Sequence, residues 1–529
     1  MADQPRLNHL SMKAKTTLLT AGLALSALTA LADPKLPNIF GDYMVLQQKR
    51  ANPVWGSADP GEKITVVIGQ QNRHATADQQ GNWKVKLNPL PAGGPYKMVI
   101  KGKSTVTFND VLVGEVWVCS GQSNMQWPVS NSFNPDLESL TAKYPRIRII
   151  SVPQVGTQEP QSNFNGKWEA VNPDNVQSFS AVGYFFGRTL HQALDVPIGL
   201  IDNAWGGSAA EAWVRKDVLA ADKRYQPLLD QWAETEKTFD FAKLQANYHK
   251  QRAAWQEKSQ AARKAGKPAP RAPRAPRNIL AGQHRPANLY NGVLKPIIGY
   301  GIQGVIWYQG ESNASRAEQY GHLFPLMIKH WRDEWQQGDF SFYWVQLADF
   351  RAEVESPADS DWAELREAQT KSLSLPNTGQ AVITDIGEGR DIHPRDKQNV
   401  AQRLTRHALA KNYGLKIAHE SPSFKSMEIK GNKAIIKFDH VSTGLYAFDT
   451  RDVRGFTIAG KDKKFHWATA QIAGRDTVIV SSEAVKTPVA VRYNWADNPI
   501  GNLTTRDPLP ANSFRTDDWP GITAGKHTR

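Results

Sequence analysis

Between about residue 111 and residue 415, apolar runs that suit buried strands alternate with stretches that suit helices. The strand-like runs lie at 111–119, 196–201, 304–308, 345–347 and 381–383. Residues 180–194 place their apolar side chains on one side of a helix, and Pro394 to Tyr413 is expected to form another. This alternation indicates an α/β domain with a parallel sheet. Ligands bind beyond the carboxyl ends of such strands, so the loops that follow them are where function is expected.

Both flanks of this region have the pattern of β structure. Residues 33–110 contain alternating and β-branched runs that are separated by turn signals. In the C-terminal flank, Met427 to Phe438 forms two alternating runs around Gly431-Asn432, which predicts a hairpin. We therefore expect an N-terminal β domain at 33–110, an α/β domain at 111–415 and a C-terminal β-rich domain at 416–529.

Residues 228–285 interrupt the α/β pattern and are interpreted as an insertion. Lys237 to Arg263 is polar and suits a solvated helix or helical hairpin, whereas Ala269 to Arg277 reads as an exposed polyproline-like linker. The formal net charge of the chain is +13, which could attract acidic polymers. Binding of a polyanion is an open interpretation of the insertion. No nucleic-acid-binding motif occurs, so we expect no nucleic-acid partner.

The first 32 residues have the pattern of a secretory signal peptide. Lys13 and Lys15 precede an apolar stretch from Leu18 to Leu31, and Ala30-Leu31-Ala32 suits an A-x-A cleavage site. We expect export to the periplasm or the extracellular space, with no integral membrane segment after cleavage. The alternative is an uncleaved helix that anchors the chain in a membrane. The oligomeric state is left open.

Neither a metal nor a cofactor is expected. The 13 His residues show no H-x-H or HExxH spacing, and the chain has a single Cys, Cys119. No GxGxxG follows a strand and no GxxxxGK[ST] occurs, which disfavours nucleotide cofactors. Any catalysis is therefore expected from side chains and backbone groups alone.

Two loops carry a candidate nucleophile and a candidate base. Ser123 lies in a Gly-containing turn directly after a strand, where a hydroxyl and a backbone N–H can face one substrate atom. His393 lies in Asp391-Ile392-His393-Pro394, where the carboxylate two residues earlier can orient the imidazole. Taken singly, a capping serine or an ordinary loop histidine is the better explanation of each motif.

Two further loops could supply hydrogen-bond donors. Gly206 and Gly207 follow a strand and let the backbone approach a ligand closely. Gln309 and Asn313 lie in a polar loop after the strand at 304–308, where either amide could donate to a developing negative charge. Ordinary turns again explain each loop by itself, but together the four loops supply nucleophile, base, orienting acid and oxyanion donors.

These motifs resemble the sialate O-acetylesterase family, a branch of the SGNH hydrolases that also includes acetylxylan esterases. The resemblance rests on Gly121–Met125, the Gly206-Gly207 loop that ends at Glu211-Ala-Trp213, Ile306–Asn313 and Asp391–Pro394. It implies a three-layer, flavodoxin-like catalytic domain with β-rich additions. It also implies a serine esterase that acts on acetylated carbohydrate, and the signal-peptide pattern adds the expectation of export. Acetylxylan or another polysaccharide is an alternative substrate, and a non-catalytic carbohydrate-binding protein is the alternative of a different class.

The resemblance also implies roles for individual residues. Ser123 is expected to be the nucleophile and His393 the base, with the N–H groups of Ser123 and Gly206 in the oxyanion hole. Gln309 is the first choice for the third donor, and Asn313 the second. The acidic member is expected to be Asp391, with two carboxylates in reserve, Asp385 and Glu388.

Overall fold

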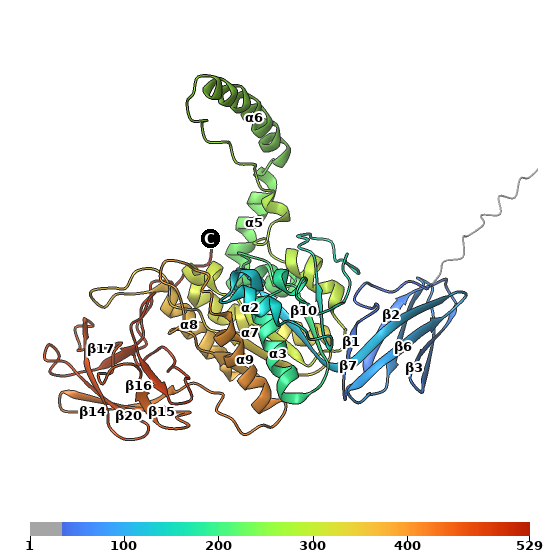
Figure 1. Ribbon diagram of the computed structural model, residues 1–529. Helices are drawn as coiled ribbons and strands as arrows, with labels where there is room; N and C mark the ends of the chain where they lie inside the picture. The colour runs from blue at the N-terminus through green and yellow to red at the C-terminus, as the bar shows by residue number, and fades with distance from the viewer. Residues whose placement is uncertain (1–33, 529) are drawn as a thin grey trace, which may run out of the picture.

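The computed structural model describes residues 34–528 (Figure 1). A β domain at the N-terminal end and a β-rich region at the C-terminal end lie on opposite sides of a central α/β domain, and a helical arm projects from the centre. The expected α/β class with β-rich additions is confirmed. The proposed signal peptide, residues 1–32, lies outside the described residues and stays a prediction.

The central domain is built on one parallel sheet with strand order β13-β12-β11-β7-β10-β8, and β9 pairs antiparallel with β8 at the edge. Without β8, the order β10-β7-β11-β12-β13 is the 2-1-3-4-5 order of doubly wound folds. The chain reverses direction of travel across the sheet between β7 and β11, which is where such folds bind ligands. The strands are Thr105–Gly121 (β7), Ile147–Ser151 (β8), Glu169–Ala170 (β9), Ile198–Asp202 (β10), Gly304–Tyr308 (β11), Ser341–Val345 (β12) and Thr378–Ala381 (β13).

Side chains alternate between the two faces of this sheet, and each face has its own core. Along β7, Val116 and Val118 pack in one buried cluster, whereas Trp117 and Cys119 pack in the other. The second cluster includes helices α3 (Ala181–Leu194) and α9 (Lys397–Lys411), and the first includes α7 (Ala317–Trp335) and α8 (Asp361–Lys371). The domain therefore has three layers, with helices on both faces of the sheet.

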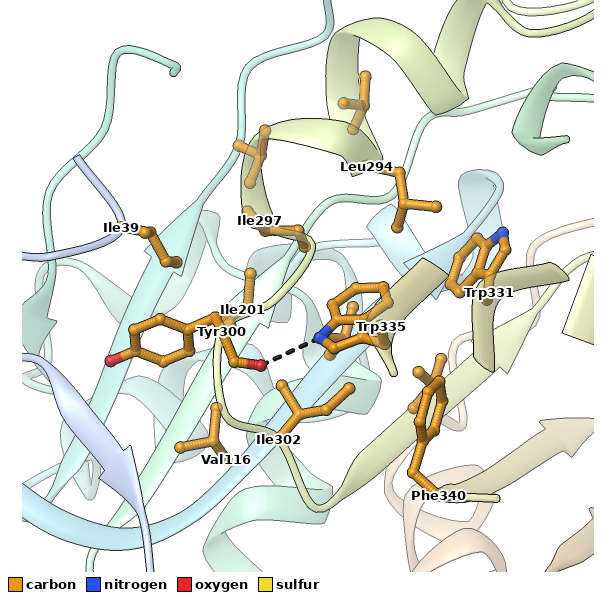
Figure 2. Close-up of a cluster of buried hydrophobic side chains, with 14 of the residues drawn as sticks. Ile39, Val116, Ile201, Leu294, Ile297, Tyr300, Ile302, Trp331, Trp335 and Phe340 are labelled. Atoms are coloured by element: carbon orange, nitrogen blue, oxygen red, sulfur yellow. Dashed lines mark hydrogen bonds between the residues drawn. The ribbon is translucent and has the colours of Figure 1, made fainter. Parts of the chain in front are cut away.

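Figure 2 shows part of the core on the α7 face. The segment that includes Tyr300 and Ile302 lies against Val116 of β7, and Trp335 at the end of α7 points toward it. Trp335 Nε1 donates a hydrogen bond to the carbonyl oxygen of Tyr300 at 3.0 Å. Because this bond satisfies the polar atom of a buried ring, it fixes the segment before β11 against the end of α7.

The N-terminal β domain continues directly into the central sheet through β7. The first part of β7 pairs with β6 and the last part with β10 and β11. The predicted boundary at 110/111 thus falls inside one strand, where Asp110 has a left-handed φ of 52°. The other strands are Val45–Gln47 (β1), Asn52–Ser57 (β2), Lys63–Ile68 (β3), Gln71–Thr76 (β4), Asn82–Leu87 (β5) and Gly93–Lys101 (β6).

The C-terminal region is antiparallel and β-rich. The predicted hairpin is confirmed, because β14 pairs with β15 and Gly431 in the turn has a φ of 61°. Its strands are Ser423–Lys430 (β14), Lys433–Asp439 (β15), Leu445–Ala447 (β16), Phe456–Ala459 (β17), Phe465–Trp467 (β18), Thr469–Ile472 (β19), Thr477–Ser481 (β20), Ala490–Tyr493 (β21), Leu503–Thr505 (β22) and Phe514–Arg515 (β23).

The insertion forms the helical arm of Figure 1, with α5 (Gln226–Thr238) near the body and α6 (Phe241–Lys264) farther out. Leu228 and Leu229 of α5 are buried, so the predicted start at 228 still belongs to the packed body. The remaining short helices are α1 (Ser123–Gln126), α2 (Pro135–Leu140) and α4 (Lys216–Ala220). Among residues 34–528, no helix is long and apolar enough to cross a membrane.

Several predicted elements differ from the structure at their ends. The strands expected at 345–347 and 381–383 lie earlier, at Ser341–Val345 and Thr378–Ala381, so each expected run begins at the last residue of the observed strand. The helix expected from Pro394 begins three residues later, because the side chain of Asp396 caps it by accepting a hydrogen bond from Asn399 N–H. His393 therefore lies on a loop that is clear of the helix.

Candidate active site

The turn that carries Ser123 forms where β7 ends beside β11. Gly121 has a φ of 134°, and a Cβ added there would lie 2.2 Å from the carbonyl oxygen of Tyr308. Only glycine fits this approach. Gln122 N–H then donates to the same carbonyl at 2.9 Å, and Ser123 becomes the first residue of the single-turn helix α1. Ser123 is thus held at the carboxyl edge of the sheet with its N–H outside the helical hydrogen-bond pattern.

His393 reaches Ser123 from a loop 270 residues farther along the chain. Its Nε2 lies 2.8 Å from Ser123 Oγ. Asp391 Oδ1 lies 3.3 Å from His393 Nδ1 and accepts a hydrogen bond from the His393 N–H at 2.9 Å. Trp127 stacks on the imidazole, with ring centroids 4.6 Å apart and planes 9° apart. With the Nδ1 proton facing Asp391, Nε2 is free to accept the serine proton.

The two reserve carboxylates are bound elsewhere. Asp385 accepts hydrogen bonds from Arg403 at 2.6 Å and 2.7 Å. Glu388 accepts from the Arg395 side chain at 3.0 Å. Asp391 is therefore the carboxylate that the structure places against the histidine.

Burial lowers the pKa of His393 below its ordinary value of 6.5. The charge of Asp391 opposes this shift, and the charge of Lys397 adds to it. Since the imidazole is then neutral at pH 7, it is in the protonation state that a general base needs.

Gly206 lies directly against Ser123. A Cβ added to Gly206 would lie 3.5 Å from Ser123 Cβ, and the preceding Trp205 N–H is tied to the Gly121 carbonyl at 3.0 Å. The Gly206 N–H donates to Oε1 of Gln126 at 2.8 Å. Gln126 is exposed, so a substrate oxygen can replace its amide oxygen at this donor. The N–H groups of Ser123 and Gly206 can then face one oxyanion.

Gln309 and Asn313 do not lie as the sequence predicts, and their expected role is corrected here. Gln309 is fully buried, and its Nε2 donates to the Ser208 carbonyl at 3.1 Å and to Asn313 Oδ1 at 2.7 Å. Both amide hydrogens are thus used inside the protein. Asn313 Nδ2 donates to Glu211 at 2.9 Å, and its Oδ1 also accepts from Ala210 N–H at 3.0 Å. These amides support the Gly206 loop from behind.

Sequence reasoning missed a buried polar network behind Ser123 and His393. Lys397 Nζ donates to Asn124 Oδ1 at 2.6 Å. Asn124 Nδ2 donates to Glu311 Oε1 at 2.7 Å and to the carbonyl oxygen of Ile392 at 2.9 Å. Asn124 thus joins the Ser123 turn, the loop after β11 and the His393 loop. A lysine four residues after the histidine, at the start of a helix, was the signal available in the sequence.

Burial shifts the charges of this network toward neutrality. Lys397 is fully buried, and burial lowers its pKa to about 7, while the nearby carboxylate of Glu311 opposes the shift. Burial raises the pKa of Glu311, and Asn124 and Lys397 oppose that shift. Because both groups are removed from water, the charge of Lys397 and the charge of Glu311 are each stabilised by the opposite charge of the other.

A serine hydroxyl, a histidine oriented by a carboxylate and backbone N–H donors meet at the carboxyl edge of a doubly wound sheet. Such an arrangement is typical of serine hydrolases, which act by acyl transfer. Among residues 34–528, no cluster of His, Cys, Asp or Glu has the geometry to hold a metal ion.

Comparison with known proteins gives the family. The family model for carbohydrate esterase, sialic acid-specific acetylesterase, matches residues 113–252 and 283–411. Mouse sialate O-acetylesterase is 31% identical over 515 residues, covering 87% of this chain and 88% of the relative. The human enzyme of that name is 28% identical, covering 90% and 92%. The chain belongs to the sialic acid-specific acetylesterase family of carbohydrate esterases, and it is an esterase.

A solved structure supports the same assignment. The crystal structure of a carbohydrate acetylesterase from Xanthomonas citri aligns with a TM-score of 0.78 and 38% sequence identity. The alignment covers 92% of this chain and 100% of that one. The flanking β regions are therefore matched together with the central domain.

Replacing Asp391 with asparagine should change both the rate and its pH dependence. For the wild-type enzyme, the acid-side limb of kcat/KM should lie below pH 6.5, because burial lowers the pKa of His393. Asp391→Asn removes the charge that raises this pKa, so the limb should move to still lower pH. The rate on its plateau should fall as the ring loses its orienting partner.

The pH profile of hydrolysis of a neutral aryl acetate measures both effects. Glu388→Gln is the matched control, because it removes a neighbouring carboxylate that bonds Arg395, and it should displace the limb much less. A larger displacement in the control than in Asp391→Asn would show that the acidic partner is misassigned.

Removing one charge of the buried network should cost more than removing both. Lys397→Met leaves Glu311 without its cation and should lower the free energy of unfolding by about 3–5 kcal/mol. Lys397→Met combined with Glu311→Gln should lose less than Lys397→Met alone, because no uncompensated charge is left. Calorimetric unfolding of the single and double variants gives the coupling. Strictly additive losses would mean that the two groups do not interact.

Proposed function

We propose that this esterase is a carbohydrate O-acetylesterase with Ser123 as its nucleophile and His393 as its general base. The observation that carries the proposal is the 2.8 Å contact between His393 Nε2 and Ser123 Oγ. Asp391 on the other ring nitrogen and Gly206 beside the serine support it. Because Ser123, Gly206 and the Asp391–His393 pair come from three different loops, the sheet edge brings the constellation together.

The mechanism that this geometry supports is a double displacement. His393 takes the proton of Ser123 as Oγ attacks the acetyl carbonyl carbon. The N–H groups of Ser123 and Gly206 donate to the oxyanion, in place of the Gln126 amide oxygen. The imidazolium then protonates the departing sugar oxygen, and the acetyl group stays on the serine. Water, deprotonated by His393, attacks this acyl-enzyme and releases acetate.

Two sugar classes are candidates for the alcohol part of the ester. The mouse and human relatives are named sialate O-acetylesterases, which favours acetylated sialic acid. The Xanthomonas structure, with its higher identity of 38%, is that of a carbohydrate acetylesterase, and acetylated xylan is the alternative substrate. Acetate release from acetylated sialic acid and from acetylated xylan, compared at equal acetyl concentration, separates the two.

Ser123→Ala should lower kcat on an aryl acetate by roughly 10³-fold or more, because the nucleophile and base act as a unit. The measurement is steady-state release of the aryl alcohol by a variant whose thermal unfolding matches that of the wild type. Ser130→Ala, an exposed serine on the same stretch of chain, is the control and should keep full activity. Near-normal turnover by Ser123→Ala would refute the assignment.

We also propose that the chain is exported and cleaved after Ala32. The support is the basic stretch, the apolar stretch and the Ala30-Leu31-Ala32 site. N-terminal sequencing of the protein recovered from the periplasm or the medium should begin at Asp33. Recovery of the intact N-terminus on protein in the cytoplasm would overturn this part of the proposal.

A further inference from the structure

The arm formed by α6 and the segment that returns from it has a defined structure of its own. It projects away from the central domain (Figure 1). The returning segment folds back along the helix, where Trp255 Nε1 donates to the carbonyl oxygen of Pro270 at 2.7 Å. The segment at 267–278 has no helix or strand, as its prolines dictate. The side chains of the arm are therefore presented on a definite scaffold.

The arm holds most of the excess positive charge of the chain. Residues 241–277 contain ten Lys and Arg against one Glu, in a chain whose net charge is +13. Within residues 34–528, no carboxylate forms an ion pair with any of these ten side chains. The ten are Lys243, Lys250, Arg252, Lys258, Arg263, Lys264, Lys267, Arg271, Arg274 and Arg277. Uncompensated charge on a projecting element attracts an anionic partner.

Three of these arginines recur at every third position of the returning segment. Arg271, Arg274 and Arg277 are exposed, whereas the intervening Pro273 and Pro276 are half-buried. A polyproline helix repeats every three residues with a rise of about 3.1 Å each, so the guanidinium groups recur at about 9 Å. Guanidinium groups bind carboxylates in a bidentate manner. A row of this kind suits a polymer that carries a carboxylate at regular intervals.

The base of the arm lies against the active site. Gln283, six residues after Arg277, accepts a hydrogen bond from Ala209 N–H at 3.2 Å. Its side chain would lie 3.3 Å from a Cβ on Gly207, next to Gly206. Six extended residues span at most about 20 Å, so Arg277 lies within that distance of Gln283. The family match stops at residue 252 and resumes at 283, so the outer arm is an addition to the shared esterase fold.

Other polyanions fit the arm less well. A helix that lies on a membrane surface needs a continuous apolar face, but the exposed large apolar side chains between 241 and 279 are confined to Leu244 and Ile279. Single-stranded nucleic acid stacks on exposed aromatic rings, and Tyr248 and Trp255 are half-buried here.

The structure assigns the arm as a binding element for an acidic polysaccharide, which it holds beside the active site. This inference rests on the proposed carbohydrate O-acetylesterase function and adds that carboxylate-bearing polymers are the preferred substrates. The arginine row binds the carboxylates, and the site at the base of the arm acts on acetyl groups of the bound chain.

The test removes the arginine row and compares three acetyl esters. The variant is Arg271→Ala/Arg274→Ala/Arg277→Ala, and its control is Lys433→Ala/Lys461→Ala/Lys464→Ala, which removes the same charge from exposed sites in the C-terminal region. The KM of the arm variant for acetylated polygalacturonate should be roughly tenfold higher at low salt, because losing three exposed ion pairs weakens binding by about that factor. High salt should remove the difference. Activity on acetylated xylan and on an aryl acetate should not change.

Direct binding of unacetylated polygalacturonate, measured by co-sedimentation, separates this inference from the esterase proposal. Loss of binding in the arm variant alone supports the inference even where the enzyme proves inactive on every ester. Equal effects in the arm and control variants would overturn it, because net charge would then suffice. It is also overturned where the arm variant loses binding to DNA or anionic vesicles while polygalacturonate binding is unchanged.

Discussion

The close approach of β7 to β11 at Gly121 is the contact on which the catalytic arrangement depends. No side chain fits between Gly121 and the Tyr308 carbonyl, so the chain turns there and presents Ser123 at the edge of the sheet. The same approach leaves the Gly121 carbonyl free to accept the Trp205 N–H, which brings Gly206 against the serine. The proposed nucleophile and the proposed oxyanion donors are thus positioned by one backbone contact between two neighbouring strands.

Asn124 extends this arrangement to the third loop. It follows the nucleophile directly and bonds both Glu311 and the carbonyl before His393, while Lys397 donates to it from the start of α9. A buried polar network of this kind is stable only when each member is paired. The serine and histidine are therefore held at hydrogen-bond distance by the interior of the protein, and not by their own contact alone.

The sequence predicted the layers better than it predicted the interior of the site. Alternation between strands and helices was readable because each strand of the sheet is apolar on both faces, as Val116 and Trp117 show. Ser123 and His393 were readable because each lies in a distinctive turn at a strand or helix boundary. Gln309 was misread because an amide at a strand end suits an oxyanion and a buried carbonyl equally well. Whether the Gln309 amide faces an oxyanion or a buried carbonyl depends on how Ser208 and Asn313 pack against it. Ser208 is distant from Gln309 in the sequence, and Asn313 carries the same amide group.

The central claim is that Ser123 forms an acyl-enzyme with the help of His393. The most direct measurement is the site of covalent labelling by a serine-directed phosphonylating reagent, determined by mass spectrometry of the digested protein. The account predicts one adduct per chain, on Ser123, and loss of that adduct in His393→Ala, since the hydroxyl is then no longer activated. An adduct on another residue, or full esterase activity in protein that carries the label on Ser123, would contradict it.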